Sequence, residues 1–194
     1  MPLNTREEAK ARGLSVANSE AQDYLDEMDW CLHFAEANRL LMRLACFEAF
    51  EACDVDFDAH VTQIIETHHN YAAIEHHFGR DVWVHRKGAV KAQGQVIIPG
   101  SMGTASYICE GLDNPESFRS CSHGAGRILG RKEANRTITH EQAVESMKHV
   151  VYGIKHGDYD EMPMAYKDVD VVIQRQADLV RPLYRLTPLA VVKG

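Results

Sequence analysis

The 194-residue sequence has no apolar run long enough to cross a membrane. A membrane-spanning helix needs about 18 or more consecutive, predominantly apolar residues. The first twenty residues carry charged side chains, among them Arg6, Lys10 and Arg12, where a secretory signal peptide has an apolar core. We therefore expect a cytoplasmic protein that does not act at a membrane.

Close cysteine pairs and the common nucleotide and zinc motifs are also missing. The five cysteines form no C-x-x-C pair, and their odd number favours a reducing compartment over a disulfide scaffold. There is no H-E-x-x-H stretch of a zinc protease and no G-x-x-x-x-G-K-[ST] phosphate loop. Any phosphate or metal chemistry must therefore use another arrangement.

The overall composition is that of an ordinary globular protein, with 45% hydrophobic and 25% charged residues. The length is sufficient for a substantial core and fits one domain. We predict a single domain over residues 1–194, in which residues 1–18 form a polar lead-in without a core of its own.

The net charge of −7 is unevenly distributed. Residues 1–79 hold 5 basic and 15 acidic side chains, whereas residues 80–136 hold 9 basic and 5 acidic ones. A local basic excess favours contact with phosphates or nucleic acid, although the chain as a whole would repel RNA. Ordinary surface variation explains the same charge distribution equally well.

Hydrophobic spacing and turn residues predict a mixture of helices and short strands. Apolar residues recur at intervals of three and four from Ser19 to about Ala52, and Ser19 with Gln22 fits a capping box, so we expect a core-packing helix there. Further helices are expected at 139–152 and 168–180, and Pro182 closes the second of them. Short strands are expected at 82–85, 95–98 and 105–109, followed near the end of the sequence by a β-prone tail at 183–192. Because the order lacks βαβ alternation, the sequence predicts an α+β fold with long helices packed around short mixed or antiparallel strands.

Six of the eleven histidines fall within 26 residues, at positions 60, 68, 69, 76, 77 and 85. Neutral imidazole is the commonest protein ligand for transition metals. The spacing matches no established metal motif, however, and most histidines in such a region lie on the surface or are satisfied inside the core. Composition alone leaves both interpretations open.

Two loops rich in small residues, 99–104 and 123–127, contain the most suggestive chemistry. The first reads Pro-Gly-Ser-Met-Gly-Thr and follows a β-prone run, so that its amides and the hydroxyls of Ser101 and Ser106 could face a phosphate. The second reads His-Gly-Ala-Gly-Arg, in which the imidazole of His123 could attack a nucleotide α-phosphorus, helped by amides and by Arg127. A plain tight turn is the alternative for the first loop, and without further motifs catalysis at His123 is the less common outcome.

Five stretches together resemble the C-terminal half of the RtcB family of RNA ligases. In chain order they are His69-Asn-Tyr71, Val84-His-Arg-Lys-Gly88, Ile98-Pro-Gly-Ser-Met-Gly-Thr-Ala-Ser-Tyr107, Ser120-Cys-Ser-His-Gly-Ala-Gly-Arg127 and Val192-Lys-Gly194. The resemblance begins near Tyr24 and reaches the C-terminus. It implies an RtcB-like fold that is incomplete relative to the family.

The resemblance assigns a role to each matching residue. His123 corresponds to the histidine that becomes guanylylated, His69 to one manganese ligand, and Lys193 to a lysine at the guanine end of the nucleotide. Tyr166 corresponds to a position near the base. The other implied nucleotide contacts are Asn70, Pro99, Gly100, Ser101, Met102, Ser106, Gly124, Ala125 and Gly126.

The resemblance also implies a reaction with GTP and Mn²⁺. His123 would take GMP from GTP, and the guanylate would pass to an RNA 3′-phosphate, which can arise from a 2′,3′-cyclic phosphate. A 5′-hydroxyl would then attack the activated end and release GMP. The implied processes are tRNA splicing and RNA repair.

One departure from the family pattern limits what this chain is expected to do alone. The family's other metal ligands, an aspartate, a cysteine and two histidines, belong to an N-terminal half, and no Asp-x-Gly-x-Gly or Asn-His-Phe stretch occurs here. We therefore expect either one part of a ligase that works with a separate N-terminal half, or a catalytically inactive remnant that binds GTP or RNA.

Overall fold

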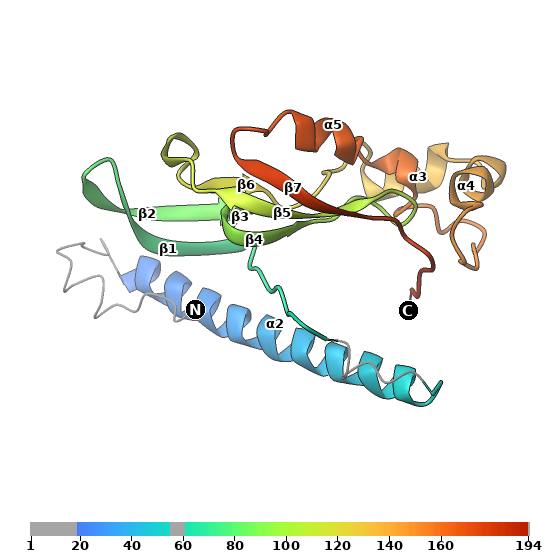
Figure 1. The fold of residues 1–194 in the computed structure, drawn as a ribbon, viewed down its shortest axis with the longest axis horizontal. Coiled ribbons are helices and arrows are strands. Elements are labelled where there is room, and N and C mark those ends of the chain that lie inside the picture. The colour runs from blue at the N-terminus through green and yellow to red at the C-terminus, as the bar shows by residue number, and fades with distance from the viewer. Residues whose placement is uncertain (1–18, 55–60, 194) are drawn as a thin grey trace. The chain divides into compact units, whose positions relative to one another are not determined.

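The computed structural model describes residues 19–54 and 61–193 (Figure 1). The polar lead-in predicted at residues 1–18 lies outside the described residues, and so does His60. The chain divides between Lys87 and Gly88 into two compact units. The expectation of a single domain over residues 1–194 stays a prediction.

The first unit contains one long helix and one hairpin. Helix α2 spans Ser19–Glu51 and confirms the longest predicted helix. Strands β1 (Asn70–His77) and β2 (Arg80–Lys87) pair antiparallel, and both turn residues have positive φ, 50° at Phe78 and 78° at Gly79. Two such residues make the tight turn that matches the twist of a β-hairpin.

One side of α2 faces the hairpin. The Ala72 N–H donates to the Met28 sulfur at 3.2 Å, and the Tyr24 hydroxyl hydrogen-bonds the His85 Nε2 at 3.1 Å. Leu32 is buried on the same side of the helix. This side therefore behaves as the spacing of apolar residues predicts.

The opposite side of α2 is also apolar but lies exposed. Trp30, Phe34 and Leu41 are 68%, 61% and 64% exposed, and the rings of Trp30 and Phe34 stack with centroids 5.7 Å apart. Spacings of four and seven place these three side chains on one face. The predicted core-packing helix is therefore only half right, because periodicity shows which residues share a face and not whether another layer covers it.

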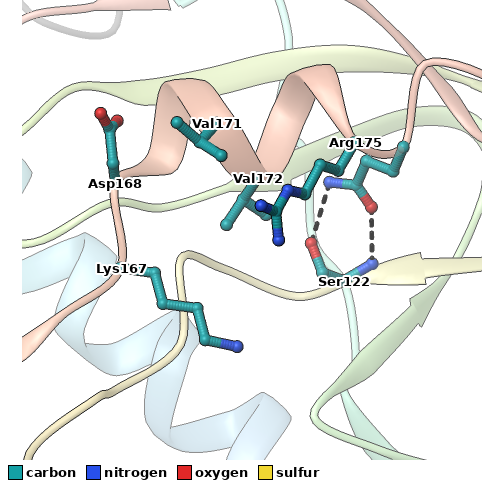
Figure 2. Close-up of a pocket in the computed structure, with 7 residues that line it drawn as sticks. Ser122, Lys167, Asp168, Val171, Val172 and Arg175 are labelled. Carbon is teal, nitrogen blue, oxygen red and sulfur yellow. Dashed lines mark hydrogen bonds between the residues drawn. The ribbon is translucent and has the colours of Figure 1, made fainter.

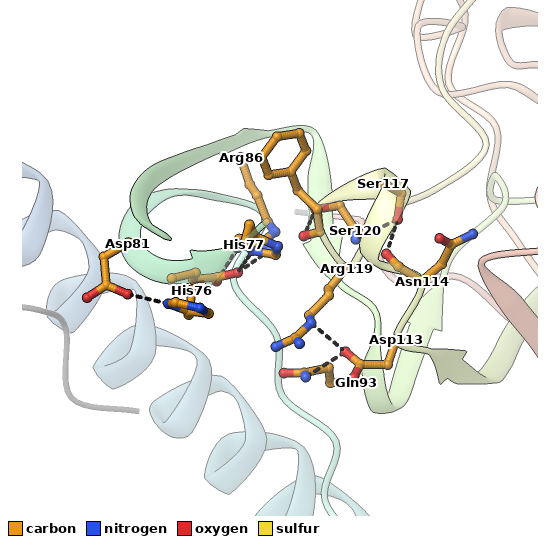
Figure 3. A network of polar contacts seen from close by, with 12 residues as sticks. His76, His77, Asp81, Arg86, Gln93, Asp113, Asn114, Ser117, Arg119 and Ser120 are labelled. Atoms are coloured by element: carbon orange, nitrogen blue, oxygen red, sulfur yellow. Dashed lines mark hydrogen bonds and ion pairs between the residues drawn. The ribbon is translucent and has the colours of Figure 1, made fainter. Parts of the chain in front are cut away.

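A buried polar network joins the two hairpin strands. Arg86, 2% exposed, donates to both carboxylate oxygens of Glu75 at 2.7 and 3.0 Å and to the Tyr71 hydroxyl at 3.1 Å. The His77 ring lies 3.0 Å from the same carboxylate. Figure 3 shows His77 and Arg86 pointing toward one another, while His76 turns to Asp81. The buried charges of the hairpin are thus paired rather than left unsatisfied.

The second unit is built on an antiparallel three-stranded sheet. Its strands are β4 (Gln93–Ile98), β5 (Ser106–Leu112) and β7 (Val180–Leu186), with β5 in the centre. Val96 and Ile98 of β4 and Cys109 of β5 are completely buried. Helix α5 (Val169–Gln174) adds Val169 and Ile173 to the same core. This core supports the ends of β4 and β5, which carry the first small-residue loop.

A second, two-stranded sheet carries the other loop. Strand β3 (Ala89–Lys91) pairs antiparallel with β6 (Ser120–Ser122), and Ala89 stands opposite Ser122. One step further along this register, Gly88 stands opposite His123, and the His123 N–H donates to the Gly88 carbonyl at 3.4 Å. The pairing of two three-residue strands therefore sets the position of the loop at 123–127.

Short helices pack around a separate apolar cluster. They are the α-helices α3 (Arg131–Thr137) and α4 (His140–Met147) and the 3₁₀ helix η3 (Pro163–Ala165). The 3₁₀ helix η2 (Pro115–Ser117) has no buried residue and takes no part in this cluster. Ala134, Met147 and Met162 are almost completely buried together. The predicted capping box of Thr139 and Gln142 is present at the start of α4.

The α+β class and the antiparallel strands are confirmed, whereas several predicted details are wrong. Only α2 is a long helix in the described part of the chain. Helix α4 ends at Met147 rather than near residue 152, α5 ends at Gln174, and Pro182 lies inside β7. The Gln22 amide nitrogen donates to Asp26, whereas the side chain of Ser19, on which the predicted capping box depends, lies outside what the structure describes. Among the described residues no helix is both long and apolar enough to cross a membrane.

Candidate functional site

The two small-residue loops are joined directly by a hydrogen bond. The Ala125 N–H donates to the Pro99 carbonyl at 2.9 Å. A Cβ on Gly124 would lie 3.1 Å from the same oxygen, so a larger residue there would press the loops apart. The structure thereby brings together His123, Gly124, Ala125, Gly126 and the loop that begins at Pro99.

The imidazole of His123 is held by a backbone carbonyl. Its Nδ1 lies 2.6 Å from the Gly88 oxygen. A carbonyl oxygen can only accept, so Nδ1 carries the proton and donates, which leaves the lone pair of the neutral ring on Nε2. Gly88 has a φ of +67°, and a Cβ there would lie 3.3 Å from the His123 Cε1. Glycine suits this position in both backbone angle and space.

The loop at 99–104 is stiffened by its own hydroxyl groups. The Ser101 N–H donates to the Thr104 Oγ1 at 2.7 Å, and the Gly100 N–H donates to the Ser106 Oγ at 3.3 Å. The Ser101 hydroxyl lies 2.9 Å from the Thr104 hydroxyl. These two amides are occupied, contrary to the expectation that they face a phosphate, because the short polar side chains compete for them.

Other backbone amides near His123 remain available to a ligand. Within the described residues, the N–H groups of Gly124 and Gly126 donate no hydrogen bond, and neither does that of Met102 in the loop at 99–104. Gly126 has a φ of +76°, an angle that lets successive amides point into one concavity. The neighbourhood of His123 therefore retains donors suited to an anionic oxygen.

Arg127 is engaged within the fold. Its guanidinium donates to the Tyr166 hydroxyl at 2.9 Å and to Glu161 at 3.2 Å, and lies over the Tyr166 ring at 4.8 Å. It also donates to the backbone carbonyls of Leu129 and Asp160. In this structure the guanidinium therefore anchors the chain, and its help in stabilising phosphate charge stays a prediction.

Tyr166 and Lys193 lie in the same acidic surroundings. Burial and the hydrogen bond to Glu161 raise the pKa of the Tyr166 hydroxyl. The Lys193 Nζ lies 2.5 Å from Asp158 and 3.1 Å from Asp160, and the bond to Asp158 raises the lysine pKa. Asp160 links this lysine to Arg127, the last residue of the loop at 123–127.

His69 and Asn70 belong to the first unit and are exposed at the start of β1. Among residues 19–54 and 61–193, no group of three or more His, Cys, Asp or Glu side chains is placed to hold a metal ion. His76 and His77 are paired with carboxylates instead. His69 alone does not fit a complete metal site, since transition metals take four or more ligands.

Gln176 is a residue of this neighbourhood that the sequence did not indicate. Its amide oxygen accepts from the Ser122 N–H at 3.0 Å, and its amide nitrogen donates to the Ser122 hydroxyl at 2.9 Å. Gln176 is buried and therefore fixes the residue directly before His123. The two residues are 54 positions apart, and no local pattern marks such a contact.

Comparison with known proteins gives one family and a set of curated relatives. The family model described as tRNA-splicing ligase RtcB matches residues 4–194. The chain is 42% identical to the RNA-splicing ligase RtcB of Escherichia coli strain K12 over 89% of this chain and 44% of the relative. It is 38% identical to the RNA-splicing ligase RtcB of Mycobacterium tuberculosis over 92% of this chain and 46% of the relative. The chain thus spans about half the length of these curated relatives.

Proposed function

The chain belongs to the tRNA-splicing ligase RtcB family, and we propose that it provides the guanylate-transfer part of a GTP-dependent RNA ligase. The observation that carries this proposal is the setting of His123. Its Nδ1 is fixed by the Gly88 carbonyl, and the amides of Gly124 and Gly126 next to it are available to an anion.

In the first proposed step, the His123 Nε2 attacks the α-phosphorus of GTP. The N–P bond forms while the bond from the α-phosphorus to the bridging oxygen breaks, and pyrophosphate leaves. The ring gains positive charge as Nε2 bonds to phosphorus, and the Gly88 oxygen at 2.6 Å stabilises the Nδ1–H that bears part of it. Available amides of the loop would stabilise the charge on the phosphoryl oxygens.

The second and third steps transfer the guanylate and seal the strand. An oxygen of an RNA 3′-phosphate attacks the same phosphorus, so that the N–P bond breaks and the lone pair returns to Nε2. The 5′-hydroxyl of the second RNA end then attacks the 3′-phosphorus and expels GMP, and its proton passes to the solvent. We expect RNA ends from tRNA splicing or RNA repair, including 2′,3′-cyclic phosphates opened beforehand, and a cytoplasmic location.

We propose that further groups come from a second polypeptide, equivalent to the portion of the relatives that this chain does not match. His69 would be one ligand of a manganese ion whose other ligands that polypeptide supplies, and no step above depends on the metal. The apolar outer side of α2, with Trp30 and Phe34 stacked and exposed, offers that polypeptide a surface of the kind that interfaces bury.

Labelled GTP tests the proposal. The chain is incubated with α-labelled GTP and manganese, alone and with the portion of Escherichia coli RtcB that it does not match. We expect an acid-labile adduct on His123 in the complemented sample, lost in His123→Ala and kept in His156→Ala, a matched change at an exposed histidine. If no adduct forms even with the complement, the ligase proposal is wrong for this chain.

A catalytically inactive GTP- or RNA-binding remnant is the second candidate, favoured by the lack of a metal cluster among the described residues. Thermal unfolding separates the two. A ligand that binds only the folded state raises the unfolding midpoint. GTP that raises the midpoint equally in the wild type and in His123→Ala, without any adduct, would identify the remnant.

A further inference from the structure

A cavity of about 320 Å³ lies beside the residue that precedes His123. Ser122 lines it, together with Lys167 and side chains from α5 and the turn that follows, Val171, Val172, Arg175 and Gln176. Figure 2 shows the side chains of Lys167 and Arg175 extending toward Ser122 from two sides. All of these residues belong to the second unit.

Two basic side chains line this cavity without a partner. Neither the Lys167 Nζ nor the Arg175 guanidinium makes a hydrogen bond or ion pair within the described part of the chain. Asp168 also lines the cavity, but its Oδ1 accepts from the Asp170 N–H at 2.9 Å, and Figure 2 shows its carboxylate turned away from both cations. The positive charge facing the cavity is therefore not neutralised.

The cavity is connected to the nucleophile loop but separate from the loop assigned to the nucleotide. The Lys167 N–H donates to the Gly126 carbonyl at 2.9 Å, and a Cβ on Gly126 would lie 3.9 Å from the Lys167 Nζ. None of the residues assigned to the nucleotide at 99–106 lines the cavity. An anion held here would lie near His123 without sharing the assigned nucleotide contacts.

We infer that this cavity binds a backbone phosphate of the RNA strand whose 3′ end receives the guanylate. This inference rests on the proposed function. Lys167 and Arg175 contact the phosphate, because Arg forms paired hydrogen bonds to phosphate oxygens and Lys supplies a point charge. Val171 and Val172 give the cavity an apolar side on which a ribose or base can lie. The subsite positions the 3′-phosphate for attack on the guanylate at His123.

The salt dependence of RNA binding tests the subsite directly. A fluorescein-labelled single-stranded RNA with a 3′-phosphate is titrated with the chain from 50 to 300 mM KCl and followed by anisotropy. Each phosphate contact in a single strand contributes about 0.7 to the slope of log K against log salt. Because the two side chains share one phosphate, the double variant Lys167→Gln/Arg175→Gln should lower the magnitude of this slope by about 0.7.

A matched control removes two charges that do not line the cavity, in Lys155→Gln/Arg136→Gln, and should leave the slope close to that of the wild type. The midpoint increase caused by GTP should be the same in all three proteins, which also shows that each is folded. An unchanged slope in the cavity variant overturns the inference. The inference is also overturned if the cavity variant loses the midpoint increase caused by GTP and keeps the salt slope of RNA binding, because the cavity then binds nucleotide phosphates.

Failure of the proposed ligase reaction gives a different result. RNA binding involves no covalent step, so a lowered slope in the cavity variant supports the subsite whether or not an adduct forms on His123. An adduct that forms normally, together with a slope unaffected by Lys167→Gln/Arg175→Gln, would retain the ligase and reject the subsite.

Discussion

The Nδ1 of His123 lies 2.6 Å from the carbonyl oxygen of Gly88, a residue 35 positions earlier in the chain. This contact decides which ring nitrogen is protonated and therefore which one can attack. It exists because strands β3 and β6 pair in a register that sets Gly88 opposite His123.

Gly88→Ala should reduce adduct formation at His123 by about tenfold or more, since a displacement of the ring lowers the fraction in attacking geometry. The new methyl group would press on the ring at 3.3 Å. Gly94→Ala is the matched control, because Gly94 has a similar φ of +65° and open space around it. Both variants should lose about 1–3 kcal/mol of stability from backbone strain. Equal adduct yields in the two variants would contradict a role for the Gly88 contact.

The protonation of His123 can be measured without any reaction. Nitrogen-15 chemical shifts of the His123 ring in its neutral form should show a protonated Nδ1 and an unprotonated Nε2. The opposite tautomer would remove the basis for attack by Nε2 and would contradict the hydrogen bond to Gly88.

Gln176→Leu should lower the free energy of unfolding by about 1–3 kcal/mol, because the Ser122 N–H then loses its acceptor next to the nucleophile. Gln176→Glu keeps an acceptor and should cost less. Gln174→Leu makes the same chemical change at an exposed position and should be within about 0.5 kcal/mol of the wild type. Urea unfolding of the wild type and the three variants measures these differences. If Gln174→Leu were as unstable as Gln176→Leu, the contact between Gln176 and Ser122 would not explain the loss.

Arg86→Met should destabilise the chain by about 3–5 kcal/mol, because it leaves the buried Glu75 carboxylate without its cation. Arg80→Met, at an exposed position on the same strand, should have little effect. The double variant Glu75→Gln/Arg86→Met should be less unstable than the sum of the single changes, since the two groups interact. Additive losses in thermal or urea unfolding would contradict a coupled pair.

Asp170→Asn should lower stability at neutral pH and have no effect in acid. The hydrogen bond from the Tyr107 hydroxyl, at 2.7 Å, lowers the pKa of the Asp170 carboxyl, with help from Arg185. A lowered pKa means that the contribution to stability is fully present above the ordinary value of 3.8 and is lost as the pH falls through the lowered one. The midpoints of the wild type and the variant should therefore differ at pH 7 and converge as the pH falls below the lowered pKa of Asp170. A constant difference across that range would show that ionisation of Asp170 does not matter.

Local signals in the sequence were sufficient for the long helix and for the two loops. The spacing of apolar residues predicts the C-terminal end of α2 to within one residue, and Thr139 and Gln142 cap α4 as the sequence predicts. Glycine and hydroxyl residues marked the loop between β4 and β5, because only small side chains allow a chain to turn so tightly. Such features depend on neighbours within a few residues.

Contacts between distant residues were not visible in the sequence. Strands β3 and β6 have three residues each, too few to show an alternating pattern, yet their pairing places His123 against Gly88. No strand is predicted where β1 lies, because its charged and polar residues break the pattern of a β-prone run, and its pairing with β2 supplies what the local sequence does not show. The anchoring of Arg127 by Glu161 and Tyr166 likewise depends on residues 34 and 39 positions away.

The position of β7 has a consequence for how the protein is made. This strand pairs with the central strand β5 but is built from residues 180–186, whereas both loops of the site occur earlier in the chain. During synthesis β5 therefore emerges long before the strand that covers its second edge. Open strand edges pair with other chains, so we expect a chain that ends before Val180 to aggregate more readily than one that includes β7. The edge of β5 that faces β7 is thus covered only after Val180 has been synthesised.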